Sequence, residues 1–312
     1  MLIIWILLGL ILLLFIASFV IFLLACMRLD GLTADLDKTV QRPVYSQCKE
    51  EIYAGRDWME THPHEDIRIT SYDGLELAGE FFPCENARGT ILMVHGWRGT
   101  PVTDFGCAIM AYYRKGLNLL LVHQRTQGPS GGKFITFGVR ERQDVHSWVR
   151  WHSERFGKDA PMLITGISMG ATTVLMAAGQ EFEANVRGII ADCGFTSPWE
   201  IIGSVIRSTR LPKYPFLPLV GVFTRLFGGF GLKEASTLEA VKNMKLPVFF
   251  AHGQEDSFVP CYMTEQAYEA CGSEEKTLLI VPGAKHGTSY LVDRENYENK
   301  IRDFVDRHCP VA

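Results

Sequence analysis

The pentapeptide Gly-Ile-Ser-Met-Gly places one serine, Ser168, where it could act as a nucleophile. The apolar run Pro161–Thr165 before it is typical of a buried strand, and the small-residue run Ala171–Ala178 after it is typical of a helix. A G-x-S-x-G sequence between a strand and a helix predicts a sharp turn that exposes the serine Oγ at the carboxyl edge of a sheet. Glycine is expected at Gly166 and Gly170 because a side chain there would collide with the turn. This context favours a nucleophile elbow over an ordinary helix N-cap.

A nucleophilic serine needs a general base and an acid that orients the base, and two downstream residues fit these roles. Asp256 follows the strand-like run Leu246–Ala251, and His286 follows the strand-like run Leu278–Val281. The carboxyl ends of parallel strands meet at one edge of a sheet, where ligands bind. The chain order Ser, Asp, His is that of the α/β-hydrolase arrangement. We therefore predict that Ser168, Asp256 and His286 form a catalytic triad.

The loop after the run Thr90–Val94 predicts an oxyanion hole. Its sequence, His-Gly-Trp-Arg-Gly at 95–99, resembles the H-G-x-x-G loop of α/β-hydrolases. In that arrangement a backbone N–H of this loop and the N–H after the nucleophile bind the developing oxyanion, and here they belong to Trp97 and Met169. Two such fixed donors would each lower the barrier by roughly 3–4 kcal/mol.

Together these motifs resemble the α/β-hydrolase-fold serine hydrolases, and most closely the serine aminopeptidase-like and lysophospholipase-like esterases, over about residues 64–308. The segment 122–132 resembles the family loop D-x-R-x-x-G-x-S-G, but His123 replaces its aspartate. This change puts local salt bridging in doubt and leaves the triad untouched. The resemblance implies a mainly parallel sheet with helices on both faces and a helical cap inserted near the active site.

Other residues compete for the acid and base positions. Asp256 fits the family loop H-G-x-x-D-x-x-V-P, so we interpret Glu255 as its solvated neighbour and Asp192 as a loop cap. His286 is preferred as the base over the eight other histidines. We expect these to pack turns (His95, His252), to lie in a helix or a loop (His146, His123) or to lie on the surface (His62, His64, His152, His308).

Metal, cofactor and nucleic-acid binding find no support in the sequence. The eight cysteines form no C-x-x-C pair and no H-E-x-x-H motif occurs, so neither a metal site nor a disulfide framework is predicted. Cys193 lies at a strand end, but its best interpretation is a core residue and not a second nucleophile. Neither a dinucleotide fingerprint nor a Walker loop is present, and no cofactor is implied. The net charge of −4 gives no nucleic-acid footprint.

The segment Met1–Met27 contains no charged residue and exceeds the roughly 20 residues that cross a bilayer. It lacks the basic start and short apolar core of a cleaved signal peptide. These features also argue against reading Leu23–Cys26 as a lipobox, and we predict a single transmembrane anchor. Lys and Arg follow the span and none precedes it, which favours a cytoplasmic catalytic domain; the opposite orientation stays open. The basic residues after the span are Arg28, Lys38, Arg42 and Lys49.

Beyond the anchor we expect a connector at 28–63 and one α/β-hydrolase domain at 64–312. In the connector, Val44–Glu60 has loosely helical apolar spacing, and we expect it to pack on the hydrolase body in preference to the alternative, a position on the membrane surface. The runs Ile67–Tyr72 and Leu75–Phe81 predict a hairpin with an Asp-Gly turn. The alternation of strands and helices that follows predicts a mainly parallel sheet.

A cap insertion is expected at about 195–243 and is rich in Ile, Leu, Phe and Pro. Its apolar residues would either receive a greasy acyl group or merely pack the cap onto the body. The glycine-rich run 228–231 is interpreted as a hinge or a turn.

These features lead us to expect a membrane-anchored serine hydrolase that cleaves carboxylic esters, with a small-molecule or lipid-like substrate and an apolar acyl group. A serine peptidase of the aminopeptidase type and a non-catalytic binding module of the same fold are the alternatives. Because the triad lies outside the anchor, a chain starting near Leu32 is expected to stay active on dispersed esters. The oligomeric state is left undetermined.

Overall fold

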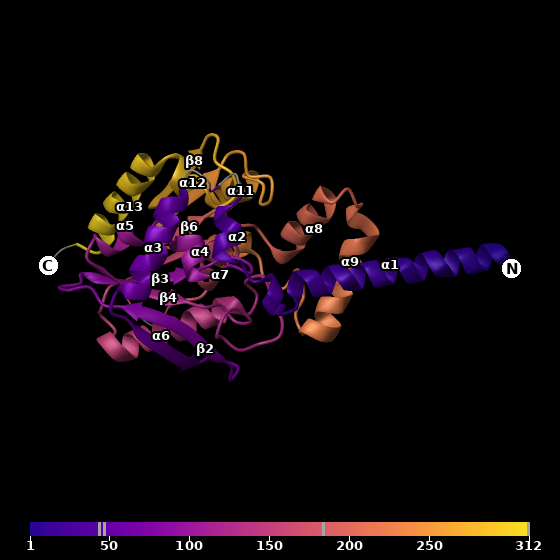
Figure 1. Ribbon diagram of the computed structural model, residues 1–312, viewed down its shortest axis with the longest axis horizontal. Coiled ribbons are helices and arrows are strands. Elements are labelled where there is room, and N and C mark those ends of the chain that lie inside the picture. The colour runs from indigo at the N-terminus through magenta and orange to yellow at the C-terminus, as the bar shows by residue number, and fades with distance from the viewer. Residues whose placement is uncertain (43–44, 46–47, 183–184, 311–312) are drawn as a thin grey trace.

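The computed structural model describes residues 1–42, 45, 48–182 and 185–310, and its centre is an eight-stranded sheet (Figure 1). The strand order is β1-β2-β4-β3-β5-β6-β7-β8. β1 and β2 form the predicted antiparallel hairpin, β2 also pairs antiparallel with β4, and the remaining pairs are parallel. The strands are β1 (Glu65–Thr70), β2 (Glu76–Phe82), β3 (Gly89–Val94), β4 (Leu117–Val122), β5 (Met162–Ile167), β6 (Val186–Asp192), β7 (Val248–Gly253) and β8 (Lys276–Val281).

Helices cover both faces of this sheet, which explains why the central strands are continuous apolar runs and not alternating ones. One buried cluster joins the sheet to α6 (Glu141–Phe156), α7 (Met169–Ala177) and α11 (Tyr262–Ala270). A second cluster lies on the other face. Its helices are α3 (Lys49–Thr61), α4 (Pro101–Phe105), α5 (Ile109–Tyr113), α12 (Ser289–Val292) and α13 (Arg294–His308). The fold class predicted from the sequence is confirmed.

The segment between the N-terminal helix and β1 packs against the body of the molecule. It contains the 3₁₀ turn η1 (Asp30–Leu32), α2 (Leu36–Val40) and α3. On α3, Ile52 and Met59 are buried, and Trp58 stacks on Phe82 with ring centroids 5.3 Å apart. Val44, which the apolar spacing included, lies outside the described residues.

The insertion between β6 and β7 forms a cap. It contains α8 (Pro198–Ser208), α9 (Lys213–Phe223), the π-helix η3 (Thr224–Gly228) and α10 (Thr237–Val241). η3 ends at Gly228, and Gly229 after it has a φ of +66°, which favours glycine. A third apolar cluster joins α8 and α9 to the loop at 134–139 and to the end of the N-terminal helix.

The N-terminal helix α1 (Leu2–Cys26) projects beyond the rest of the molecule (Figure 1), and α9 and η3 pack against its C-terminal half. Within the described residues it is the one helix whose length and composition suit a membrane span. Most of its side chains are exposed, which is unlike a core helix, whereas Ser18, Phe22 and Cys26 are buried.

One surface prediction is wrong. His152 is fully buried on the inner face of α6, one turn after Trp148, because residues i and i+4 of a helix share a face. Burial lowers the pKa of His152 to about 4, so its ring is neutral at neutral pH.

Candidate active site

Ser168 occupies the sharp turn between β5 and α7. Its backbone has φ 56° and ψ −118°, a conformation that residues other than glycine rarely adopt. The turn is tight on both sides. A Cβ at Gly166 would lie 2.4 Å from the carbonyl oxygen of Gly170, and a Cβ at Gly170 would lie 1.9 Å from the carbonyl oxygen of Val94. Both positions therefore require glycine.

The structure brings Ser168, His286 and Asp256 into one hydrogen-bonded chain. His286 Nε2 lies 2.9 Å from Ser168 Oγ, and His286 Nδ1 lies 2.6 Å from Asp256 Oδ2. A carboxylate opposite Nδ1 favours the tautomer with its proton on Nδ1, which leaves Nε2 free to accept from the serine hydroxyl. Ser168 and Asp256 are buried, and the His286 ring is partly exposed.

Asp256 is held as an anion by four donors. Its Oδ1 accepts from the N–H groups of Phe258 and Val259, each at 2.9 Å. Its Oδ2 is shared by His286 and His252, whose Nε2 lies 3.1 Å away. Burial raises the pKa of this carboxyl, but the hydrogen bonds from the two histidines outweigh burial and lower it to about 2. Asp256 is therefore ionised at neutral pH.

His252 is a site residue that sequence reasoning assigned to turn packing. Its ring is fully buried, and Nδ1 lies 2.6 Å from Thr264 Oγ1, so the ring is fixed from both sides. The available signal was the loop H-G-x-x-D, in which this histidine precedes Asp256 by four residues.

The two rival acids lie elsewhere. Glu255 is exposed. Asp192 is fully buried at the end of β6, where it accepts from Ser289 Oγ at 3.1 Å and from Tyr297 OH at 3.0 Å. The interpretation of Asp192 as a loop cap is wrong, because these bonds tie α12 and α13 to the sheet. Burial raises the pKa of its carboxyl.

The loop after β3 carries Trp97 next to Ser168. Gly96 N–H donates to Asp104 Oδ2 at 2.6 Å, which holds the start of the loop. In the described part of the chain, neither Trp97 N–H nor Met169 N–H donates to an internal acceptor. The predicted role of both N–H groups as oxyanion donors is compatible with this pattern.

The same loop is bound to the end of α1. Trp97 Nε1 donates to the carbonyl of Ala25 at 2.9 Å, and Arg98 Nη2 donates to the carbonyls of Leu24 at 3.0 Å and Met27 at 2.8 Å. A cation at a helix C-terminus satisfies its last carbonyls and interacts favourably with the helix dipole. The N-terminal helix is thus attached to the loop that borders the nucleophile.

The segment with His123 keeps its salt bridges despite the missing aspartate. Arg125 forms two bonds of 2.6 Å to Asp144 and also pairs with Asp73 at 2.9 Å. His123 Nε2 lies 3.4 Å from Glu80 Oε1. The substitution therefore leaves the loop ion-paired.

Two cavities meet at Ser168, and Trp97 and Phe258 also border both. The first, of about 320 Å³, is almost entirely apolar and lies between the cap, α1 and the triad. The second, of about 450 Å³, is more polar and includes Arg42 and Lys285. The side chains of the first cavity come from α1 (Ile21, Leu24, Ala25), from the cap (Phe195, Ile201, Ile202, Val205, Ile206, Thr209, Leu211) and from the body (Trp97, Phe137, Ser168, Phe258, Val259).

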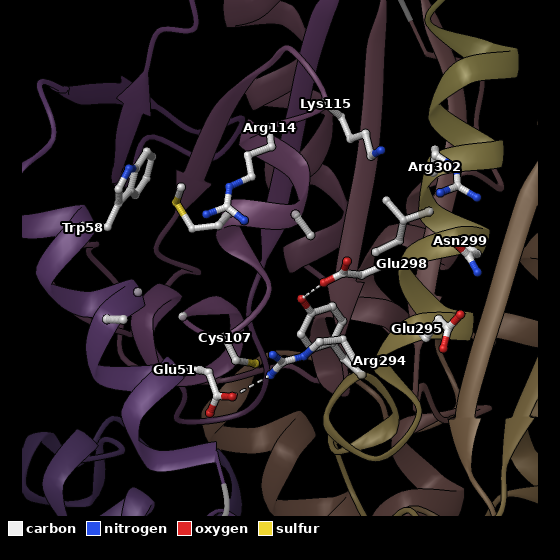
Figure 2. Close-up of a pocket in the computed structure, with 17 residues that line it drawn as sticks. Glu51, Trp58, Cys107, Arg114, Lys115, Arg294, Glu295, Glu298, Asn299 and Arg302 are labelled. Carbon is white, nitrogen blue, oxygen red and sulfur yellow. Dashed lines mark hydrogen bonds and ion pairs between the residues drawn. The ribbon is translucent and has the colours of Figure 1, made fainter.

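A third cavity, of about 530 Å³, lies away from the triad between α3, α5 and α13 (Figure 2). Two polar contacts lie at its wall: Arg294 lies 3.3 Å from Glu51, and Tyr290 donates to Glu298 at 2.5 Å. No triad residue borders it, so its size does not make it the active site.

Cys193 lies beside the triad, a proximity that its position in the sequence did not suggest. Its Sγ is within 4.8 Å of ligand atoms of Asp256 and His286. The side chain is fully buried, and burial together with Asp192 and Asp256 raises its pKa well above the usual value. Cys193 is therefore a protonated thiol, which is a poor nucleophile and a poor metal ligand.

Comparisons with known proteins agree with this architecture, although no family model matches the chain. Protein YqkD of Bacillus subtilis, described as uncharacterized, is 30% identical over 239 residues, which cover 76% of this chain and 78% of that protein. The membrane protein YNL320W of Saccharomyces cerevisiae, also uncharacterized, is 26% identical over 248 residues, 78% of this chain and 80% of its own. A monoglyceride lipase of the same yeast is 23% identical over 296 residues, 78% of this chain and 94% of the lipase.

Among solved structures, the Pyrococcus furiosus esterase Pf2001 superposes with a TM-score of 0.66 at 22% identity, over 81% of this chain and 94% of the esterase. That likeness concerns the fold. The chain belongs to the α/β-hydrolase family, and the resemblance inferred from its motifs is confirmed.

Proposed function

We propose that this protein is a membrane-anchored serine hydrolase that cleaves carboxylic esters with an apolar acyl group. The observation that carries the proposal is that Ser168 Oγ, hydrogen-bonded to His286, opens onto the apolar cavity. Small-molecule sites are typically apolar pockets of this size with a few convergent polar groups. The names of two relatives, a monoglyceride lipase from yeast and a thermostable monoacylglycerol lipase from Bacillus, support ester chemistry.

In the proposed mechanism, His286 Nε2 accepts the proton of Ser168 Oγ as the oxygen attacks the ester carbonyl. Asp256 stabilises the imidazolium that forms. The N–H groups of Trp97 and Met169 hold the oxyanion. The imidazolium then gives its proton to the departing alcohol, and a water molecule activated by His286 hydrolyses the acyl-enzyme.

The two cavities suggest how the ester is oriented. An apolar acyl chain gains about 0.8 kcal/mol for each methylene that it buries in the first cavity. The alcohol then faces the second cavity, where the exposed cations Arg42 and Lys285 suit a polar group. The proposed substrate is therefore amphiphilic, with its ester bond at Ser168.

An aminopeptidase activity has less support. A peptide with a free ammonium needs an anionic partner near the scissile bond. Among the described residues that border the two cavities, Asp104 is the single carboxylate. It is partly buried and already accepts from Gly96 N–H, and desolvation raises its pKa.

We also propose the division into an anchor at 1–27, a connector at 28–63 and a hydrolase domain at 64–312, with the domain in the cytoplasm. The basic residues after α1 support this orientation through the positive-inside rule. Protease treatment of sealed vesicles of known sidedness tests it. The domain should be digested only from the cytoplasmic side, and digestion from the opposite side would reverse the assignment.

The experiment that tests the activity compares p-nitrophenyl esters of graded chain length with aminoacyl p-nitroanilides. Wild type and Ser208→Ala, which removes an exposed serine at the end of α8, should hydrolyse the esters and prefer medium or longer acyl chains. Ser168→Ala should lose turnover by roughly 10³-fold or more. Faster turnover of the anilides would favour the peptidase, and no turnover of either substrate class would favour a binding module.

A further inference from the structure

We propose that α1 is part of the active site as well as an anchor. Its last two turns form one wall of the first, apolar cavity, which would hold the acyl chain and is called the acyl cavity below. The cap beside these turns lies in the bilayer, so that the acyl chain enters from the membrane. This inference rests on the proposed esterase function and adds the substrate's source, a membrane-resident amphiphilic ester.

The first argument is that α1 closes the cavity. Ile21, Leu24 and Ala25 face the same apolar space as Ser168, opposite the cap residues Ile202 and Ile206 and their neighbours. Without α1 this cavity would lack one wall and would be a groove along the cap that is open on that side. The helix thus supplies part of the surface that an acyl chain would contact.

The second argument is that α1 is fixed in this position. The bonds from Trp97 and Arg98 to the carbonyls of its last turn are joined by two more: Ile135 N–H donates to Cys26 at 2.6 Å, and Arg28 N–H donates to Lys133 at 2.8 Å. A helix held at its end by side chains and backbone on both sides does not swing freely. The anchor and the catalytic domain therefore move as one body.

The third argument concerns depth in the membrane. About 20 helical residues at 1.5 Å each cross the roughly 30 Å hydrocarbon core of a bilayer. Counted from Leu2, that segment ends near Ile21. The cap, however, already contacts α1 at Phe15, whose ring lies 6.4 Å from Phe223, and at Phe19, 5.2 Å from Phe223. A spanning α1 therefore carries this part of the cap into the apolar layer.

The fourth argument is that the cap has a surface suited to lipid. Leu226 is 70% exposed and Phe227 is 54% exposed, and Val222 beside them is exposed as well. Phe227 also contacts α1, with its ring centroid 5.7 Å from that of Phe19, so this patch adjoins the anchor. An exposed apolar patch next to a transmembrane helix matches a membrane contact. Arg225, exposed on the same π-helix, has a long side chain that can reach the headgroups.

The opening of the cavity lies at the expected membrane surface. Leu24 on α1, Leu211 after α8 and Phe258 of the body border the cavity and are also exposed. The proposed entrance lies between the first two, on the side of the anchor. By the count above, Leu24 lies near the boundary between the acyl chains and the headgroups. An acyl chain could pass from the bilayer to Ser168 there, while its polar group turns toward the second cavity.

The test uses the full-length protein in phosphatidylcholine vesicles. Leu24→Trp should narrow the entrance and lower the ratio of dodecanoate to acetate hydrolysis by about tenfold. The matched control Leu12→Trp replaces an exposed leucine of α1 away from the cavity and should keep the wild-type ratio. An unchanged ratio in Leu24→Trp would overturn the role of α1 as a cavity wall.

A second variant tests the membrane contact of the cap. The measured quantity is the turnover of a long-chain ester embedded in vesicles divided by the turnover of the same ester in detergent. Leu226→Glu should lower this ratio by about fivefold or more. Val292→Glu, at an exposed apolar position on α12, is the control and should keep the wild-type ratio. Equal ratios in all three proteins would overturn the embedded cap. In each case an active wild type keeps the proposed function intact, whereas a wild type without ester turnover refutes both proposals.

Discussion

Replacement of Asp256 by asparagine tests the hydrogen-bond geometry of the site. The N–H groups of Phe258 and Val259 both point at Oδ1, so an asparagine must keep its oxygen there. Its amide nitrogen is then forced into the Oδ2 position, opposite His286 Nδ1 and His252 Nε2. An NH₂ group at that place donates to His286 Nδ1 and moves the ring proton to Nε2, which can then no longer accept from Ser168.

The expected loss follows from this wrong tautomer. In a serine protease triad the same type of change lowers kcat by about 10⁴-fold, which corresponds to roughly 5.5 kcal/mol of barrier. His252 Nε2 also lies 2.9 Å from the Val259 carbonyl, which can only accept, so His252 keeps its proton on Nε2 and loses its bond to residue 256 in the variant. Circular dichroism of Asp256→Asn therefore accompanies the kinetics as the control for folding. Steady-state hydrolysis of p-nitrophenyl butyrate by wild type, Asp256→Asn and the neighbouring control Glu255→Gln measures the effect.

Glu255→Gln should cost little because Glu255 is exposed. An asparagine variant within tenfold of wild-type kcat, or a larger loss in Glu255→Gln than in Asp256→Asn, would refute the reasoning.

Three further predictions follow from the structure. The pKa of Asp256 in the folded state is about 2, below its ordinary value of 3.8. The ionised carboxylate therefore stabilises the fold by about 2 kcal/mol above pH 4, and this stabilisation is lost as the pH falls through 2. The difference in unfolding free energy between wild type and Asp256→Asn should shrink over that pH range, and a constant difference would contradict the prediction. Gly170→Ala should destabilise the protein by about 3 kcal/mol or more, since its Cβ would overlap the carbonyl of Val94; a melting temperature equal to that of Gly31→Ala, which has open space around it, would contradict this. A chain that starts at Leu32 lacks α1 and therefore one wall of the apolar cavity. Its kcat/KM should fall more for dispersed long-chain esters than for acetate esters. Equal losses on both esters would indicate that α1 only attaches the protein to the membrane.

The parts of the site that sequence reasoning found are those that local patterns and chain order determine. The elbow at Ser168 needs glycines at fixed offsets between a strand and a helix, so a short window is enough to find it. Asp256 and His286 follow core strands, and parallel strands bring their carboxyl ends to one edge whatever the rest of the fold does. The structure places these three side chains within hydrogen-bond distance.

The parts that sequence reasoning missed depend on contacts between distant segments. The bond from Trp97 to Ala25 joins residues 72 positions apart, and nothing in either segment alone indicates it. For this reason the anchor looked separable from the site. The expectation that a chain starting near Leu32 stays active on dispersed esters remains a prediction, to which the structure adds an expected loss on long-chain esters. His152 was assigned to the surface because it is polar. Its position on the buried face of α6, one turn after Trp148, was not considered.

The most direct test of the central claim is to identify the residue that reacts with a fluorophosphonate in the full-length protein. Only an activated serine is labelled, and tandem mass spectrometry of the digested protein locates the adduct. We predict one adduct per chain on Ser168, retained in Ser208→Ala and lost in Ser168→Ala together with ester turnover. An adduct on another residue, or a Ser168→Ala variant that keeps more than a tenth of wild-type ester hydrolysis, would contradict the account.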